Sequence, residues 1–431
     1  MEMLESVQSN RKPQIRRLGI TVGLAILFLA ILLWWASAGS TLTVASSPAP
    51  QEAVVLNNGS VITVGVAAGL SGWVPEVGWR QANAVQLAIS QTNAAGGVDI
   101  GGVTYTVTVV VADSACNATQ AVTAANTLLN AGAVAVVGHT CSSASFPAQP
   151  IYNAAGVPMV SPSSSAPVLT EQGYTTTFRV FPRDGAQAVL MATYFSQSLG
   201  MDAVALVEWS GYEFSTDAFS NTFTNLGGTV TSRRTVTSTD DYTATLTAIQ
   251  TENPDAVFYA DNDASNAGFF SDIAHSLGLS VIGWDAIWGD ETVLGDYATA
   301  AGSAAAEGDY AGLQGRRTED MPGYDTLNAD YQAAGFPNYG DEAQAWGAYA
   351  YDAAKIIIAA IDRADSTDPT AIRDEIAATA DYEGVVGTYE GFDAKGDVIP
   401  QWSWLERYQN GQWVILHPSK VFLPVVLNNF Q

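Results

Sequence analysis

The sequence predicts an α/β protein with two lobes, each built around a parallel sheet. The chain has 431 residues, which suits two or three domains of roughly 100–200 residues each. From Val61 onward, apolar strand-like runs alternate with amphipathic helical segments, and the same alternation starts again after Arg183. A strand, helix, strand repeat of this kind is typical of parallel sheets with right-handed crossovers.

The first series predicts five elements. In the helix over 118–130, Ala121, Ala125 and Leu128 recur at helical spacing on one face, which indicates an apolar stripe against a sheet. The helix before it has Val85, Ala88, Ile89 and Thr92 on one face. The elements, in order, are a strand over 61–67, a helix over 82–93, a strand over 105–113, the helix over 118–130 and a strand over 134–138.

The second series is of similar size. It predicts helices over 186–199, 216–226, 242–252 and 264–277, alternating with strands over 203–208, 229–235 and 256–260. A longer helix follows at 343–361, where Ala350, Ala353, Ile357 and Ile361 form a stripe that is more typical of a core than of a cofactor site. Short strands are expected over 385–389 and 401–408.

The two ends of the chain differ from the body. Leu18 to Ala36 is an apolar run preceded by four bases, so residues 1–45 are predicted to be a signal peptide or a membrane anchor. Cleavage after Ala38 and an uncleaved span both fit this pattern. Residues 46–60 are rich in Ser, Pro and Ala, which predicts a linker, and residues 418–431 form an apolar tail without an assigned role.

Charge and cysteine content bound the function. The whole chain has a net charge of −26, and because its first 45 residues are net positive by two, the exported part carries −28. A field of that sign repels nucleic acid and anionic lipid, so no nucleic-acid partner is expected and the membrane is met only through the N-terminal helix. An extracytoplasmic compartment favours a disulfide between Cys116 and Cys141. A metal site is the poorer alternative, because the histidines are scattered at His139, His275 and His417.

No motif of catalysis or cofactor binding stands out. The sequence has no Gly-x-Ser-x-Gly elbow, no His-Glu-x-x-His and no P-loop, and the glycines after the first strand form no dinucleotide fingerprint. The acid clusters Asp240/Asp241 and Asp261/Asp263 are interpreted as solvated or helix-capping side chains rather than as catalytic or calcium-binding groups. No enzyme activity and no cofactor are therefore expected.

Two serine-rich turns each follow a strand. They are His139-Thr-Cys-Ser-Ser-Ala-Ser and Ser161-Pro-Ser-Ser-Ser-Ala-Pro. The carboxyl edge of an open α/β sheet is where ligands bind, and a helix that begins there offers free N–H groups to an anion. Plain N-caps and turns would explain either segment alone. The two together favour a site for a carboxylate.

At these turns the chain resembles the leucine/isoleucine/valine-binding protein family. The matching segments are Asp113-Ser-Ala-Cys-Asn-Ala-Thr-Gln-Ala-Val, Gly138-His-Thr-Cys-Ser-Ser and Val160-Ser-Pro-Ser-Ser-Ser-Ala-Pro-Val-Leu-Thr. The resemblance runs from about Val61 to Val414 and is strongest over 61–182. It implies a type I periplasmic-binding-protein fold, in which two Rossmann-like lobes joined by three crossing segments close on a ligand. Residues 61–182 and 313–395 would form lobe 1, and residues 183–312 and 396–417 lobe 2.

The family resemblance also implies roles for single residues. Ser142 would hydrogen-bond the ligand α-carboxylate, and the Ser163 backbone and Ser165 would contact the amino-acid head group. In the second lobe, Gly283-Trp-Asp-Ala resembles the segment whose acid pairs with the ligand ammonium, which nominates Asp285. A zwitterion needs donors at one end and an anion at the other.

The departures from the family concern the ligand side chain. Val77 stands where the family has an aromatic residue, with Trp73 and Trp79 on either side. Phe214 falls near a family tyrosine, and Asn262 lies in a segment more polar than the family's. These five residues are expected near the ligand side chain.

The function that follows is capture of an amino acid, branched-chain or related, outside the cytoplasm and its delivery to an ABC permease of the branched-chain amino-acid type. A ligand-sensing module that signals through a partner and a surface hydrolase are the alternatives.

Overall fold

The computed structural model describes residues 60–286, 291–302 and 304–416. The expected signal peptide or anchor, most of the expected linker and the apolar tail lie outside these residues. Among the described residues no helix is both long and apolar enough to span a bilayer.

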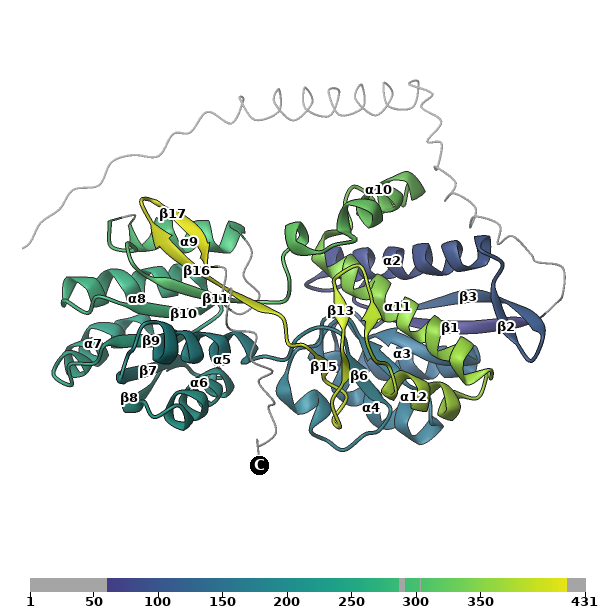
Figure 1. The fold of residues 1–431 in the computed structure, drawn as a ribbon, viewed down its shortest axis with the longest axis horizontal. Helices are drawn as coiled ribbons and strands as arrows, with labels where there is room; N and C mark the ends of the chain where they lie inside the picture. The colour runs from purple at the N-terminus through teal and green to yellow at the C-terminus, as the bar shows by residue number, and fades with distance from the viewer. Residues whose placement is uncertain (1–59, 287–290, 303, 417–431) are drawn as a thin grey trace, which may run out of the picture. The chain divides into compact units, whose positions relative to one another are not determined.

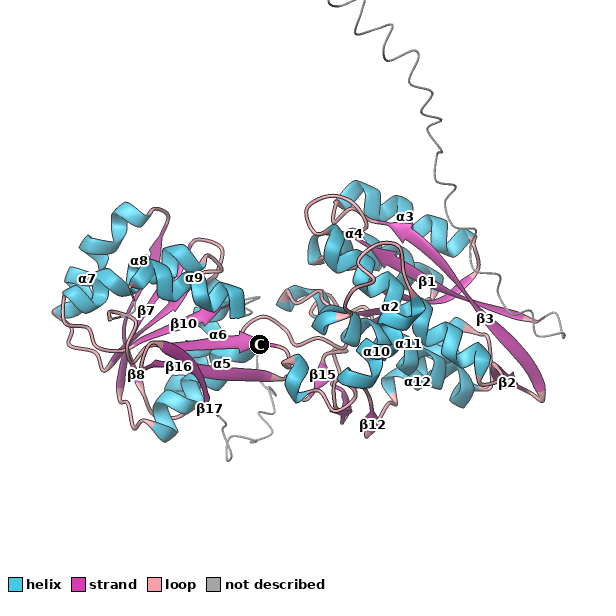
Figure 2. Cartoon of the chain, turned by 90° about the horizontal axis from the view of Figure 1, so that it is seen from above, coloured by secondary structure: helices cyan, strands magenta, loops and turns pink. Residues whose placement is uncertain are grey.

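Lobe 1 contains a six-stranded sheet in the order β2-β3-β1-β4-β5-β6, parallel except for the short β2 (Figure 1). Helices cover both faces of it. One face is covered by α2 and the later helices α10, α11 and α12, and the other by α3 and α4, as Figure 2 shows. The strands are β1 (Val61–Ala68), β2 (Val98–Ile100), β3 (Val103–Asp113), β4 (Ala133–Gly138), β5 (Met159–Ser161) and β6 (Thr177–Arg179), and the helices are α2 (Pro75–Ala94), α3 (Ala118–Asn130), α4 (Ser142–Ala155), α10 (Tyr324–Ala334), α11 (Gln344–Ala364) and α12 (Pro369–Ala377).

Lobe 2 contains a seven-stranded sheet in the order β17-β16-β11-β10-β9-β7-β8. Its core strands are parallel, and β16 and β17 add an antiparallel edge. Helices α5 and α6 cover one face, and α7, α8 and α9 cover the other (Figure 2). The strands are β7 (Ala203–Trp209), β8 (Thr229–Val236), β9 (Ala256–Ala260), β10 (Ile282–Ala286), β11 (Tyr310–Gln314), β16 (Ser403–Gln409) and β17 (Gln412–Leu416), and the helices are α5 (Ala186–Thr193), α6 (Glu213–Asn225), α7 (Tyr242–Gln250), α8 (Ala264–Ser276) and α9 (Glu291–Ala301).

Three segments cross between the lobes and bond to one another. The Gln314 side-chain amide donates to the Pro182 carbonyl at 3.0 Å, and the Gly315 amide donates to the Trp402 carbonyl at 3.0 Å. The Arg183 amide donates to Gln401 Oε1 at 2.7 Å. The two-lobed α/β fold with a three-segment hinge is therefore confirmed.

The apolar stripes read from the sequence are buried as expected. Val85, Ala88 and Ile89 of α2 and Ile357 and Ile361 of α11 all lie in the core of lobe 1, where the two helices pack side by side (Figure 1). The helix expected over 186–199 is interrupted, because its last turn, Tyr194–Ser198, is a π-helix. The helix expected from 82 begins earlier, at Pro75, a residue that suits a first helical turn.

A buried acid, Asp352 of α11, anchors the chain after α12. Its carboxylate accepts hydrogen bonds from the Val385 and Val386 amides, each at 2.8 Å, and from the Tyr389 hydroxyl at 2.9 Å. Residue 384 passes so close that a Cβ there would lie 2.6 Å from Asp352 Oδ2, so only glycine fits. Burial raises the pKa of Asp352 to about 6, against the opposing effect of these hydrogen bonds.

Candidate functional site

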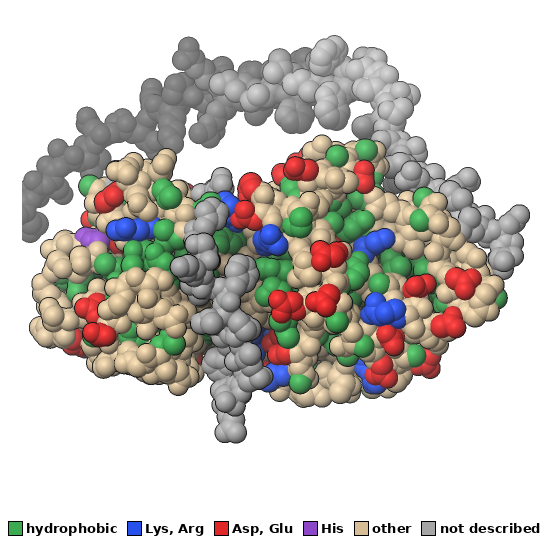
Figure 3. Space-filling model, in the orientation of Figure 1, with side chains coloured by type: hydrophobic (Ala, Val, Ile, Leu, Met, Phe, Trp, Pro, Cys, Tyr) green, Lys and Arg blue, Asp and Glu red, His purple; other side chains and the backbone are tan. Residues whose placement is uncertain are grey.

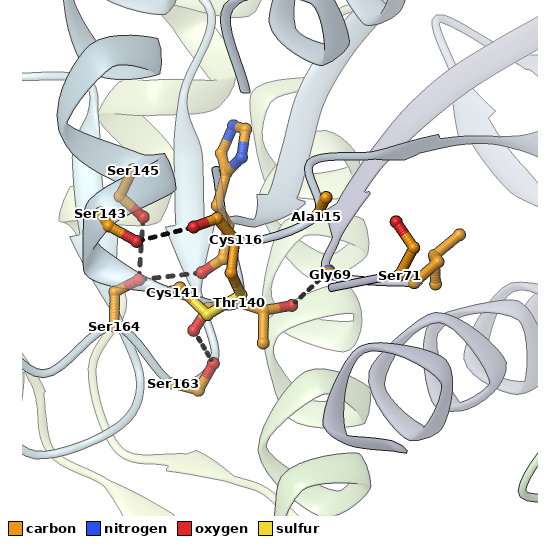
Figure 4. The surroundings of a disulfide bond; sticks show 12 residues. Gly69, Ser71, Ala115, Cys116, Thr140, Cys141, Ser143, Ser145, Ser163 and Ser164 are labelled. Carbon is orange, nitrogen blue, oxygen red and sulfur yellow. Dashed lines mark hydrogen bonds between the residues drawn. A yellow bond between two sulfur atoms is a disulfide. The ribbon is translucent and has the colours of Figure 1, made fainter. Parts of the chain in front are cut away.

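A disulfide joins two strand ends in lobe 1, as the sequence predicts. Cys116, after β3, is bonded to Cys141, after β4, with their Cα atoms 5.3 Å apart. The Ser143 hydroxyl donates to the Cys116 carbonyl at 3.0 Å, which ties the start of α4 to the same loop (Figure 4). The bond thus fixes the two loops from which α3 and α4 begin.

The carboxyl edge of this sheet is a network of polar groups. The Thr140 hydroxyl accepts from the Gly69 amide at 3.0 Å and donates to Gln81 Oε1 at 2.7 Å (Figure 4 draws the first bond). Asp113 accepts from the Leu70 amide at 2.9 Å and from the Ser71 hydroxyl at 2.5 Å. Three strand ends are therefore held in one arrangement by side chains, which is the rigid support a binding site requires.

The Ser163 hydroxyl belongs to that network. It donates to the Thr140 carbonyl at 2.6 Å and accepts from Gln81 Nε2 at 2.8 Å, and the residue is 1% exposed. Figure 4 shows its side chain directed at Thr140. Both functions of the hydroxyl are therefore used inside the lobe. The Ser163 amide, in the backbone that the family resemblance nominates, donates a long hydrogen bond of 3.4 Å to Ser161 Oγ.

Within the described residues, the hydroxyl hydrogens of Ser142 and Ser165 have no acceptor at hydrogen-bond distance. Ser142 is the first residue of α4, and its oxygen accepts from the Ala166 amide at 3.3 Å. Ser165 Oγ is buried and has no partner at hydrogen-bond distance within the described residues. Burial raises the pKa of the nearby Asp184 carboxyl, and the Ser165 hydroxyl opposes that rise. The Ala166 contact brings the two predicted serine turns together at the N-terminus of α4.

Asp285 lies in β10 of lobe 2 and is fully buried. Neither carboxylate oxygen forms a hydrogen bond within the described residues. Burial raises the pKa of Asp285 well above its usual range, the neighbouring Gln187 side chain opposes that rise, and the negative charge of Asp184 adds to it. The charged group that acts on Asp285 is thus another acid, Asp184, and no cation of the described chain offsets the negative charge of Asp285.

The residues expected near the ligand side chain lie on loops and helix starts. Trp73 is 68% exposed, Val77 is half-buried, and Trp79 donates its indole N–H to the Leu70 carbonyl at 3.1 Å. In lobe 2, Phe214 lies in the first turn of α6 and Asn262 is exposed just after β9. All five border the carboxyl ends of strands, but the structure records no contact that joins them.

The interpretation of the second acid cluster is half right. Asp263 caps α8, accepting from the Ser265 and Asn266 amides at 2.9 Å each. Asp261 is not solvated: it is 2% exposed and accepts from the Tyr259 hydroxyl at 3.0 Å. The reason is that the chain leaves β9 over the aromatic core of lobe 2, where Tyr259 turns its hydroxyl toward this carboxylate. Asp240 and Asp241, in contrast, are exposed as expected.

Sequence reasoning missed Arg179, Asp184 and Gln187, which surround the predicted site residues. Arg179 is fully buried and contacts the second serine turn, Asp184 lies at the first crossover, and Gln187 faces Asp285. No periodicity marks a buried arginine or a glutamine in an apolar helix.

A cavity of about 970 Å³ lies at a different place in the described chain. It is lined by residues of both lobes near the first crossover, among them Glu171, Arg183, Phe214 and Lys395, and Ser142, Ser163 and Asp285 are not among them. This cavity therefore does not coincide with the predicted site residues, and the buried polar groups without partners, Ser165 Oγ and the Asp285 carboxylate, identify the candidate site better.

One face of the molecule shows how charged side chains are distributed. On the face drawn in Figure 3, acidic side chains are scattered with basic ones among them and form no single patch. Within the described residues, no group of three or more His, Cys, Asp or Glu is placed to hold a metal ion.

Comparison with known proteins gives consistent relatives. A family model described as periplasmic binding protein matches residues 61–411. The chain is 29% identical over 344 residues to a leucine-, isoleucine-, valine-, threonine- and alanine-binding protein of Pseudomonas aeruginosa, covering 78% of this chain and 87% of the relative. It is 29% identical over 313 residues to a Leu/Ile/Val-binding protein homolog of Brucella melitensis, covering 72% and 81%.

Solved structures agree in fold. A leucine-binding protein from Thermotoga maritima superimposes with a TM-score of 0.61 at 26% identity, covering 83% of this chain and 98% of that one. An ABC transporter substrate-binding protein from Desulfitobacterium hafniense in complex with Leu gives a TM-score of 0.63 at 25% identity, covering 83% and 100%.

Proposed function

Because the chain belongs to the periplasmic binding protein family, we propose that it captures a neutral amino acid between its lobes, outside the cytoplasm, and delivers it to an ABC permease of the branched-chain amino-acid type. The relatives are binding proteins rather than enzymes, and no catalytic step is part of the proposal. The N-terminal 45 residues would export the protein or hold it at the membrane.

The observation that carries the proposal is the unpartnered carboxylate of Asp285. A buried charge without a partner costs several kcal/mol, so a carboxylate in this position is either protonated or neutralised by something that binds. The α-ammonium of an amino acid supplies a positive charge and three donors. Binding would therefore satisfy Asp285 in its ionised form.

Lobe 1 offers the complementary half. The Ser142 and Ser165 hydroxyls and the N-terminus of α4 are donors, and a carboxylate is stabilised by hydroxyl donors and by the positive end of a helix dipole. Donors in one lobe and an acid in the other match the two ends of a zwitterion. A ligand would bridge the halves when the hinge closes.

The exposed indole of Trp73 and the rings of Trp79 and Phe214 offer apolar surface to a ligand side chain, and Asn262 adds a polar group. The relatives' names include leucine, isoleucine, valine, threonine and alanine. These features support a neutral side chain of small to medium size.

Thermal-shift screening of the twenty amino acids tests the proposal. A ligand present at 100 times its dissociation constant stabilises the folded protein by about 2.7 kcal/mol, which is readily measured. Stabilisation by one or a few neutral amino acids is expected. No shift with any of them, in protein that melts cooperatively, would contradict the proposal.

A further inference from the structure

Arg179, at the end of β6, holds the second serine turn by its carbonyl groups. Its side chain is fully buried. Nη1 donates to the carbonyls of Ser164 at 3.3 Å, Ser165 at 2.8 Å and Ala166 at 2.9 Å. Three successive peptide carbonyls of the turn therefore face one guanidinium nitrogen.

The rest of the guanidinium is fixed from the other side. Nε donates to Asp397 Oδ1 at 2.5 Å, and Nη2 donates to the Thr170 hydroxyl at 3.0 Å. Asp397 is 2% exposed, and Arg183 Nη1 donates to its second oxygen at 3.2 Å. Asp397 precedes Gln401, whose side chain bonds the first crossover, so Arg179 connects the turn to chain that leads into the hinge.

Because peptide groups are planar, these carbonyl contacts also fix the direction of the N–H groups of Ser165 and Ala166. In a trans peptide the carbonyl of one residue and the N–H of the next point in opposite directions. Holding the carbonyls of Ser164 and Ser165 toward Arg179 therefore directs the N–H groups of Ser165 and Ala166 away from it. The Ala166 N–H reaches Ser142 Oγ at 3.3 Å. Since the Ser142 oxygen accepts there, its hydroxyl hydrogen stays available to a ligand.

We propose that Arg179 is a positioning residue for carboxylate recognition: it orients the serine turn so that Ser142 and Ser165 donate to the ligand carboxylate. The inference rests on the proposed function and adds the residue that sets its specificity for a carboxylate. Arg179 itself does not touch the ligand.

Arginine suits this role better than lysine. A guanidinium presents donors in a rigid fork and can serve several acceptors on different sides at once, whereas an ammonium acts as a single point. Arg179→Lys would keep the charge opposite Asp397 but could not also hold three carbonyls. Arg183→Lys is the matched control, because Arg183 shares Asp397 and yet makes no recorded contact with the carbonyls of the turn.

The test compares carboxylates with carboxamides by titration calorimetry. The probes are L-leucine, L-alanine and L-threonine, each with its α-amide, in which a neutral group replaces the carboxylate. The native protein should prefer at least one amino acid over its amide by about tenfold or more. In Arg179→Lys this ratio should fall toward one, with amide binding little changed, and in Arg183→Lys it should persist.

A second variant, Ala166→Pro, tests the inference if the Arg179→Lys protein does not fold. Ala166→Pro removes the N–H that reaches Ser142 and leaves the arginine contacts in place, and the native φ of −53° is compatible with proline. The ratio of amino-acid affinity to amide affinity should also fall in Ala166→Pro. A folded Arg179→Lys or Ala166→Pro protein that keeps the native ratio overturns the inference while leaving the proposed function intact. A native protein that binds none of the six probes and is stabilised by none of the twenty amino acids overturns both.

Discussion

The backbone amide of Asp184, in the first crossover between the lobes, donates to the carbonyl of Ser165, in the second serine turn, at 2.8 Å. The same carbonyl accepts from Arg179. A movement of the crossover is thus transmitted to a turn that we assign to ligand binding. Closure and carboxylate recognition are expected to be coupled.

Ligand binding should compact the protein. The proposed contacts are divided between Ser142 and Ser165 in lobe 1 and Asp285 in lobe 2, so both ends of one amino acid are satisfied only after hinge closure. Small-angle scattering of the full protein with and without the amino acid that gives the largest thermal shift measures this. The radius of gyration should decrease at saturation, and an unchanged value would count against closure.

Ser165→Ala should weaken ligand binding, whereas Ser163→Ala should lower the stability of the fold. Ser165 Oγ has no partner at hydrogen-bond distance in the part of the chain that the structure describes, so its loss should leave the melting temperature nearly unchanged and weaken ligand binding by about 1–3 kcal/mol. Ser163→Ala removes the acceptor of Gln81 Nε2 and the donor to the Thr140 carbonyl, which should lower the free energy of unfolding by a similar amount. Melting curves and calorimetry on both variants separate the roles. A Ser165→Ala protein with native affinity would remove that hydroxyl from the site.

The disulfide should stabilise lobe 1 by about 3.5 kcal/mol on the chain-entropy estimate for a sequence separation of 25 residues. The double variant Cys116→Ala/Cys141→Ala, compared with native protein in denaturant, measures this. Ligand affinity should also fall, because Cys141 immediately precedes Ser142 at the start of α4. Two free thiols in natively exported protein, seen by mass spectrometry, would refute the bond.

Asp352 predicts a pH dependence of stability. Its pKa in the folded protein is about 6, whereas an unfolded chain has about 3.9. The folded state therefore binds the extra proton between these values, and the contribution is fully present below about pH 4 and lost as the pH rises through about 6. Asp352 contributes at most about 3 kcal/mol to the free energy of unfolding in this way. Urea denaturation at pH 4.5 and pH 7 measures this. The free energy of unfolding should fall more between the two pH values in the native protein than in Asp352→Asn, and equal decreases would contradict the raised pKa of Asp352.

The sequence predicted the architecture well, because the apolar stripes of α2 and α11 and the alternation of strands and helices are local patterns. It also placed Ser142, Cys116 and Cys141 at the carboxyl edge of one sheet. The sequence could not show which serine hydroxyls are already hydrogen-bonded within the protein. Ser163 and Ser165 look alike in sequence, and only the positions of Gln81 and Thr140 show that one hydroxyl is already used. The burial of Asp261 depends in the same way on the contact with Tyr259.

The ammonium role of Asp285 is tested most directly by titration calorimetry of Asp285→Asn with the amino acid that gives the largest thermal shift. The substitution keeps the shape of the side chain and removes the charge, so affinity should fall by about 2–5 kcal/mol, roughly thirtyfold to several thousandfold. Asp263→Asn is the control, since asparagine caps a helix as well as aspartate does and the residue follows β9, the strand beside β10. It should bind with nearly native affinity. A folded Asp285→Asn protein whose affinity equals that of the native protein would contradict the account.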